Sequence, residues 1–141
     1  MVVPQVSINY LAVLVASIAG MVVGAFWYSP LLFGKVWMRE SGISSRQINE
    51  AKKRGMGKSY FAAFVGILVM SFVLAHFVRY AGATTWTEGL EAGCWLWLGF
   101  IAPVLLGSVL WEGKSVKLYL INALQYLVVL LMMGAILASW V

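Results

Sequence analysis

The stretch from Gly24 to Trp37, GAFWYSPLLFGKVW, ends the first long apolar run of the chain and leads into its most strongly charged segment. It holds two Trp, one Tyr and two Phe around Pro30. A proline disfavours helical backbone at the preceding residue, so we expect the first helix to end at Ser29. This pattern is typical of a chain that leaves a membrane, and the other interpretation is a ligand site built from aromatic side chains.

The overall composition favours a membrane protein. Of the 141 residues, 62% are hydrophobic and 11% are charged, whereas soluble domains carry about a quarter charged residues. Asp is absent, and the single Cys94 excludes an intrachain disulfide and a cysteine-rich metal site. The first 34 residues contain no Lys or Arg, so the basic segment of a signal peptide is missing and we expect a retained span.

Four segments without formal charge are long enough to cross a bilayer, which takes about 20 helical residues. They cover residues 8–28, 59–78, 92–111 and 118–141. Their apolar character is continuous rather than alternating, which favours helices over strands. The sequence therefore predicts an all-α polytopic membrane protein, in which residues 1–141 form a single integral membrane domain with a four-transmembrane-helix bundle.

The basic residues of the loops predict how the spans are oriented. The loop 30–58 carries seven Lys or Arg residues and the loop after the third span carries two, whereas the opposite side has only Arg79. Because loops rich in Lys and Arg stay in the cytoplasm, we expect the 30–58 loop to be cytoplasmic and both termini to lie on the outer side of the membrane. This distribution also explains the net charge of +5 without a nucleic-acid partner.

Residues at the inner ends of the spans are expected to anchor the chain at the membrane surface. Aromatic rings are enriched at bilayer interfaces, and we prefer this interpretation to ligand stacking. The expected interfacial anchors are Trp27, Lys35, Trp37 and Trp111. The apolar residues 31–37 are expected to lie along the inner interface as a short amphipathic helix.

A second short helix is predicted inside the cytoplasmic loop. Ser44 and Gln47 match a capping box, and Gly55 is a typical helix stop. Glu50 and Arg54 lie four residues apart with the polarity that stabilises a helix. Its basic residues either hold anionic lipid heads or only fix the orientation of the spans; we favour the second role, and a weak attraction to membrane lipids follows from both.

Polar residues near the inner ends of the spans form a candidate pocket. Polar groups are unfavourable in hydrocarbon unless they are paired, so they indicate either packing contacts or function. The candidate pocket consists of Tyr28, Ser29, Glu112, Asn122 and Gln125. Asn122 and Gln125 lie three residues apart and therefore share one helical face. The competing interpretation, which we prefer, is that these residues only form hydrogen bonds between helices.

Small residues predict where helices approach one another. Gly20 and Gly24 form a GxxxG pair in the first span, and Ala62 and Gly66 form a related pair in the second. Such pairs allow close backbone contact, either inside the bundle or between copies of the chain. Four helices alone enclose little room for a pathway, so a transporter of this size is expected to be a homo-oligomer.

A proline predicts an irregularity in the third span. Pro103 lies near its centre, where it removes one backbone donor and frees the carbonyl of Gly99. Gly99 and Gly107 flank the proline by four residues on either side. We therefore expect a kink with close helix packing at these three residues. Broken helices occur at transport sites, but prolines are also tolerated in ordinary spans.

Seven segments together carry a pattern: INYLAV (8–13), WYSPLLFGK (27–35) with Trp37, GMGKSY (55–60), AHF (75–77), GATT (82–85), WLGF (97–100) and LINA (120–123). This pattern resembles the bacterial membrane family called domain of unknown function 1761. The resemblance spans nearly the whole chain and implies a small four-span integral membrane protein of the bacterial cytoplasmic (inner) membrane. It implies no established activity, cofactor or catalytic residue, and it adds weight to the WYSP and FGK block and to Asn122.

Two functions fit these observations. The first is a homo-oligomeric binder or transporter of a small molecule or lipid of unknown identity, with the ligand at the candidate pocket. The first span offers only Asn9 and Ser17 as polar groups and no carboxylate, so we expect no proton coupling of the kind found in small multidrug exporters. The second is an accessory or structural membrane protein that acts through partner helices or lipids. We expect no enzyme, metal or cofactor, because His76 has no ligand or catalytic partner at helical spacing.

Overall fold

The computed structural model describes residues 5–140, and no strand occurs among them. Four helices are long and apolar enough to cross a membrane: Tyr10–Trp27 (α1), Gly57–Tyr80 (α4), the interrupted helix Trp86–Leu110, and Val116–Ser139 (α8). Two short helices, Gly34–Ser41 (α2) and Ser45–Arg54 (α3), connect α1 to α4. The predicted all-α class with four long apolar helices is therefore confirmed.

The third long helix is irregular near its proline. It consists of α5 (Trp86–Leu96), a π-helical turn (Trp97–Ile101), α6 (Ala102–Leu105) and α7 (Gly107–Leu110). At the end of the π-helical turn, the N–H of Ala102 donates to the carbonyl of Trp97, five residues back. Pro103 follows directly and has no N–H to donate. The irregular turn thus lies where the sequence predicted a kink.

This helix begins at Trp86, six residues before the start that we predicted. The hydroxyl of Thr85 accepts the N–H of Glu88 at 3.3 Å, and the carboxylate of Glu88 accepts the N–H of Thr84 at 2.8 Å. These reciprocal bonds satisfy free donors at the helix start. The prediction had excluded this turn because it carries acidic residues, which are stable near a helix N-terminus.

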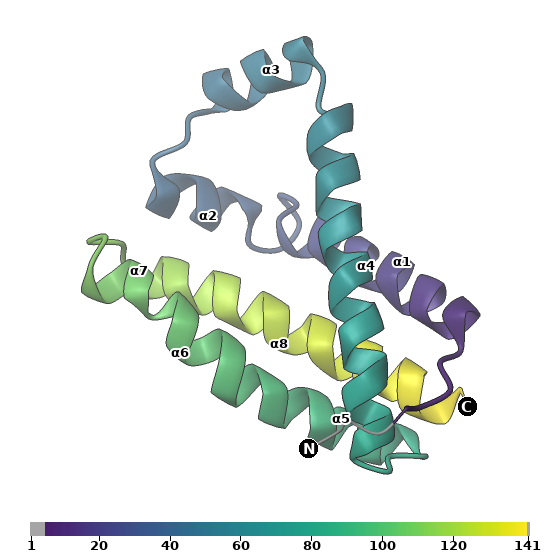
Figure 1. Cartoon of the computed structure of the whole chain (residues 1–141). Coiled ribbons are helices and arrows are strands. Elements are labelled where there is room, and N and C mark those ends of the chain that lie inside the picture. Colours follow the sequence, from purple (N-terminus) through teal and green to yellow (C-terminus); the bar gives the residue numbers. More distant parts are fainter. Residues whose placement is uncertain (1–4, 141) are drawn as a thin grey trace.

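The core of the molecule is built around α8, which packs against α1, α4 and α5 (Figure 1). Its principal members on α1, α4 and α8 are Ala12, Val13, Ala16, Leu74, Ala75, Val78, Val129, Leu130, Met133, Leu137 and Ala138. They come from the N-terminal half of α1 and the C-terminal halves of α4 and α8. All three helices therefore pack together at one end of the molecule.

At the other end, α4 separates from its neighbours. Figure 1 shows α4 crossing α1 and α8, with its N-terminal half extending away from them toward α3. Every residue from 57 to 63 is exposed. Because α4 diverges from a well-packed crossing, a cleft opens between its N-terminal half and the other two helices.

Two buried serines join α1 to α4 at the packed end. Ser17 and Ser71 are both fully buried, and their hydroxyls donate to the same carbonyl oxygen of Val13, at 2.7 and 3.0 Å. A hydroxyl in an apolar interior needs such a partner, because water is not available there. The polar atoms of the core are therefore satisfied within the protein.

The closest helix contact lies between α5 and α8 and depends on glycines. A Cβ atom added to Gly93 would lie less than 3.0 Å from the carbonyl of Leu130, and one added to Gly89 would be equally close to the carbonyl of Gly134. Gly89 and Gly93 form a GxxxG pair that we did not single out in the sequence. This pair allows the two backbones to touch.

The glycines predicted from the sequence have different surroundings. A Cβ atom on Gly20 would collide with the side chain of Ile67, so this glycine does lie at the crossing of α1 and α4. A Cβ atom on Gly99 would meet nothing within 4 Å, and one on Gly107 would meet only a tryptophan ring at 3.7 Å. The close packing expected at Gly99 and Gly107 is therefore not found there within the described chain; it lies instead at the glycines of α5.

The helix predicted inside the loop 30–58 forms as α3 (Ser45–Arg54) and begins with the predicted cap. The N–H of Gln47 donates to the hydroxyl of Ser44 at 3.2 Å, and the N–H of Ser44 donates to Oε1 of Gln47 at 2.8 Å, which confirms the capping box. The i,i+4 ion pair joins Arg46 to Glu50 at 3.2 Å rather than Glu50 to Arg54. Both side chains are largely exposed, so this pair contributes little to stability.

Candidate functional site

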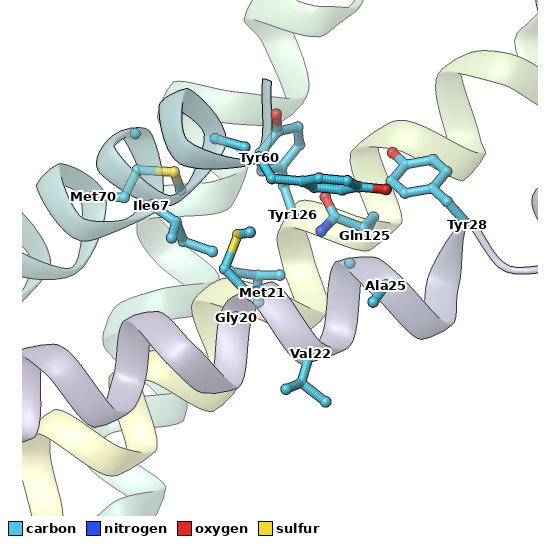
Figure 2. A pocket seen from close by; sticks show the side chains of 14 residues that line it. Gly20, Met21, Val22, Ala25, Tyr28, Tyr60, Ile67, Met70, Gln125 and Tyr126 are labelled. Atoms are coloured by element: carbon cyan, nitrogen blue, oxygen red, sulfur yellow. The ribbon is translucent and has the colours of Figure 1, made fainter. Parts of the chain in front are cut away.

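The cleft between α1, α4 and α8 has a volume of about 900 Å³ and is the candidate site (Figure 2). Its walls come from the C-terminal half of α1, the N-terminal half of α4 and the middle of α8. No residue that lines it carries a formal charge at neutral pH. A molecule in this cleft would therefore meet an apolar surface with a few neutral polar groups.

The polar groups of the cleft are gathered at one end. In Figure 2 the hydroxyl groups of Tyr28 and Tyr60 point toward each other beside the amide of Gln125. The side chains of Met21 and Met70 lie on the opposite side of this group. Methionine is flexible and adapts to the shape of what it contacts. The cleft thus has a polar end and an adaptable apolar end.

Tyr28 at the end of α1 is hydrogen-bonded to Asn122 of α8. The hydroxyl of Tyr28 donates to Oδ1 of Asn122 at 2.8 Å. Asn122 supports the cleft from behind and does not line it, whereas Tyr28 does. The side chain of Asn122 therefore has a packing role, and the hydroxyl oxygen of Tyr28 still has lone pairs that can accept a hydrogen bond.

The same turn of α8 receives two further long-range hydrogen bonds. The indole N–H of Trp27 donates to the carbonyl of Ile121 at 2.9 Å, and the indole N–H of Trp97 donates to the carbonyl of Ala123 at 2.7 Å. Interhelical hydrogen bonds in membrane proteins contribute about 0.6 to 2 kcal/mol each. Residues 121–123 of α8 therefore position the end of α1 and the π-helical turn relative to the cleft.

The aromatic block that follows α1 folds back on itself. The N–H of Phe33 donates to the carbonyl of Trp27 at 3.0 Å, and the rings of these two residues lie 4.7 Å apart. The ring of Trp37, in α2, lies edge-on to Tyr28 at 5.7 Å. Helix α2 begins at Gly34, so the helix expected over residues 31–37 starts later because residues 28–33 form this turn.

This arrangement changes the interpretation of the predicted anchors. Trp27 and Trp37 contact the protein itself through the bonds and rings described above. Lys35 is exposed, and Trp111 is 86% exposed. These two exposed side chains are available as interfacial anchors, whereas Trp27 in α1 and Trp37 in α2 help to hold these two helices in position.

Gln125 is a buried polar residue of the cleft whose amide has no hydrogen-bond partner within residues 5–140. It is only 8% exposed and lines the cleft on α8. Its amide makes no hydrogen bond among the residues that the structure describes, and no polar side-chain atom that is sealed from the surface there lacks a partner. The amide of Gln125 is therefore open to the cleft and free to bind something in it.

Two residues of the predicted pocket lie outside the cleft. The hydroxyl of Ser29 donates to the carbonyl of Phe26 at 2.7 Å, so it caps the end of α1 and does not face α8. Glu112 is exposed in the turn after α7. Conversely, Tyr60, which is not among the predicted pocket residues, lines the cleft. Of the predicted pocket, Tyr28 and Gln125 line the cleft and Asn122 supports it.

The remaining titratable residues form no cluster of metal ligands. Within residues 5–140, no group of three or more His, Cys, Asp or Glu side chains is placed to hold a metal ion. The ring of His76 lies 2.8 Å from the carbonyl of Phe72 and packs against the ring of that residue. The expectation that the chain uses neither a metal nor a cofactor stays a prediction.

Comparison with known proteins gives one match. A family model described as "Protein of unknown function (DUF1761)" matches residues 11–138, nearly the whole chain. No curated protein and no solved structure matches it.

Proposed function

We propose, from the premise that this chain belongs to the DUF1761 family of proteins of unknown function, that it binds or transports a small molecule or lipid in the cleft between α1, α4 and α8. The observation that carries this proposal is the cleft itself, which has a volume of about 900 Å³ and contains the unpartnered amide of Gln125. Ligand sites typically combine an apolar surface with a few well-placed polar groups. Four apolar helices support a multi-pass membrane location.

The substitution Gly66→Phe should block this cleft without unfolding the protein. Gly66 lines the cleft, and a Cβ atom added there would meet nothing within 4 Å, so a phenylalanine has room to project into the space. We expect saturable labelling by a C18 alcohol with a photoreactive diazirine in its chain to fall at least about tenfold, because the ring occupies the space of the chain. Mass spectrometry of labelled peptides measures the loss on α1, α4 and α8.

The matched control is Gly99→Phe, which also adds a ring in open space but away from the cleft. It should label like the wild-type protein. Circular dichroism and size-exclusion chromatography verify that both variants are folded. If labelling is equal in the wild type and Gly66→Phe, or if no labelling saturates, the cleft is not a binding site.

We also propose that the protein lies in the bacterial inner membrane with both termini outside and the loop 30–58 in the cytoplasm. The proposal is supported by the seven basic residues of that loop against one on the opposite side. In a Cys94→Ser background, Thr84→Cys should react with a membrane-impermeant maleimide in intact spheroplasts. Lys53→Cys should react only after permeabilisation. The reverse pattern would mean that the chain has the opposite orientation.

A homo-oligomer is part of the same proposal. The cleft is bounded by three helices and open on the side where α4 diverges, and residues 57–63 of α4 contact nothing that buries them. A second copy placed there would enclose a path that one chain leaves open. Crosslinking in membranes through a cysteine at Ala62, in the Cys94→Ser background, tests this part separately.

The second candidate function is an accessory protein that acts through partner helices or lipids. The observation that favours it is α3, in which no residue is buried and three of the last four positions are basic. Such a helix is available to a partner or to anionic lipid heads. This function predicts that Gly66→Phe leaves the cellular phenotype unchanged, whereas a binder or transporter loses activity.

A further inference from the structure

The chemistry of the cleft indicates what kind of ligand it would hold, and the central residue is Gln125. Its side chain is more than nine-tenths buried, yet its amide has no partner among the described residues and opens into the cleft. Because the amide opens into the cleft, whatever fills the cleft at this point, water or ligand, has to hydrogen-bond it, since an unpaired amide is unfavourable. A carboxamide offers two donor hydrogens and one acceptor oxygen. The group that satisfies it must therefore accept or donate hydrogen bonds, and a group that does both suits it best.

The neighbours of Gln125 have the same neutral character. The hydroxyl of Tyr28 has already donated its hydrogen to Asn122, so it offers an acceptor to the cleft. Tyr60 and Tyr126 add hydroxyl groups to the lining. None of the ten Lys and Arg residues and none of the five Glu residues lines the cleft. A charged group entering this site would lose hydration without meeting an opposite charge, which is strongly unfavourable.

The two ends of the cleft lie at different depths along the helices. Met21 precedes Tyr28 by seven residues, which is about 10 Å along α1, and Met70 follows Tyr60 by ten residues, about 15 Å along α4. Tyr28 and Tyr60 lie at the ends that join the loop 30–58, and the methionines lie farther into the spans. The cleft therefore has its polar end near the membrane surface and its apolar end toward the middle. A lipid in one leaflet is arranged in the same way, with its polar head near the membrane surface and its hydrocarbon chain toward the middle.

We propose that the ligand is a neutral amphiphile of the bilayer, whose uncharged donor-and-acceptor group binds the amide of Gln125 and whose hydrocarbon chain runs toward Met21 and Met70. A hydroxyl or amide head fits this description. A permanently charged head does not. This inference rests on the proposed function, because it specifies the ligand of the same cleft.

The test uses four competitors that share one C18 chain and differ only in the head: oleyl alcohol, oleamide, oleyl sulfate and oleyl trimethylammonium. Each competes with the photoreactive C18 alcohol for the wild-type protein in nanodiscs of phosphatidylcholine. We expect the alcohol and the amide to compete at concentrations about tenfold lower than both charged compounds. Competition for the residual labelling of Gly66→Phe takes place outside the cleft, through attraction of the charged heads to the basic loop. This background is subtracted from the wild-type values.

Two variants connect this preference to the polar end of the cleft. Gln125→Met keeps the length of the side chain and removes its hydrogen bonds, so neutral competitors should lose about fivefold in potency. Tyr60→Phe removes one exposed hydroxyl with no internal partner and should give a smaller loss in the same direction; it remains informative if Gln125→Met fails to fold.

The outcomes separate the two proposals. If binding depends on Gly66 but the four heads compete equally, or if a charged head competes best, the inference of a neutral ligand is wrong and the proposed function stands. If Gln125→Met and Tyr60→Phe both fold and keep the wild-type preference, the assignment of the polar end is wrong. If no compound gives labelling that Gly66→Phe removes, the proposed function itself fails.

Discussion

Replacing Gly93 by alanine should lower the free energy of unfolding by about 3 kcal/mol, and Gly93→Leu should prevent α5 from packing on α8 at all. The reason is the direct backbone contact at this position. The added Cβ would lie less than 3.0 Å from the carbonyl of Leu130, and a backbone atom inside a regular helix cannot move aside cheaply. The two helices must then separate, and contacts along their whole length are weakened.

Unfolding of the purified protein by SDS in mixed micelles, followed by circular dichroism, measures this effect. The matched control is Gly66→Ala, which makes the same change inside an α-helix where the methyl group meets nothing within 4 Å. That variant should be neutral or slightly more stable, since alanine favours a helix over glycine by about 1 kcal/mol. Equal stabilities of Gly93→Ala and Gly66→Ala would contradict the contact between α5 and α8.

The sequence contains both glycines of this contact, but the charged residues beside them led us to place the first of them outside the third span. Gly89 and Gly93 have GxxxG spacing, yet Glu88 and Glu91 lie beside them, and a search for uncharged segments placed the start of the third span at residue 92. The Thr85 to Glu88 spacing also matches a capping box, which alone would have moved the start to the observed position. The GxxxG spacing and the capping-box spacing each depend on a few neighbouring residues. Hydropathy averaged over a whole span detects neither of them.

The irregular turn before Pro103 was predictable only in its location. A proline without an N–H must disturb the hydrogen bonds one turn earlier. The form of the disturbance, a π-helical turn over Trp97–Ile101, depends on contacts made elsewhere. The indole N–H of Trp97 donates to the carbonyl of Ala123. A hydrogen bond between two distant segments cannot be predicted from the sequence of either segment alone.

The sequence could indicate those residues of the candidate site that are polar within an otherwise apolar span. Asn122 and Gln125 are amides inside an apolar span, and the structure gives them different surroundings: Asn122 accepts a hydrogen bond from Tyr28, whereas Gln125 lines the cleft and has no partner within residues 5–140. Packing, the role that we preferred for both residues, describes Asn122, and ligand binding by Gln125 stays a prediction. Glu112 was proposed because it follows the third span directly along the chain; it is exposed in the turn after α7 and is not among the residues that line the cleft.

The missing residues of the site come from α1 and α4. Met21, Tyr60 and Met70 became lining residues because of how α4 crosses α1 and α8. Both helices are apolar all round, so no polar face indicates which side is turned inward. In a membrane the lipid-facing side is as apolar as the packed side. The crossing of α4 is therefore the part of the fold that hydropathy could not supply, and the cleft depends on it.

The turn after α1 carries the other large effect. Gly34 is the first residue of α2, and a Cβ added there would lie less than 3.0 Å from backbone atoms of Tyr28 and Ser29. The same turn is closed by the N–H of Gly34, which donates to the carbonyl of Ser29 at 2.9 Å. A methyl group at Gly34 therefore cannot be accommodated without opening the turn.

We expect Gly34→Ala to lower the free energy of unfolding by about 2 kcal/mol and to reduce labelling of the cleft, because Tyr28 loses the support of the turn and its bond to Asn122. The control is Gly57→Ala, which changes the first residue of another helix, where the methyl group meets nothing within 4 Å. It should match the wild type in SDS unfolding and in labelling. If the two variants behave alike, the turn does not position Tyr28; if Gly34→Ala loses stability but labels normally, binding in the cleft is independent of the aromatic block that ends the first span.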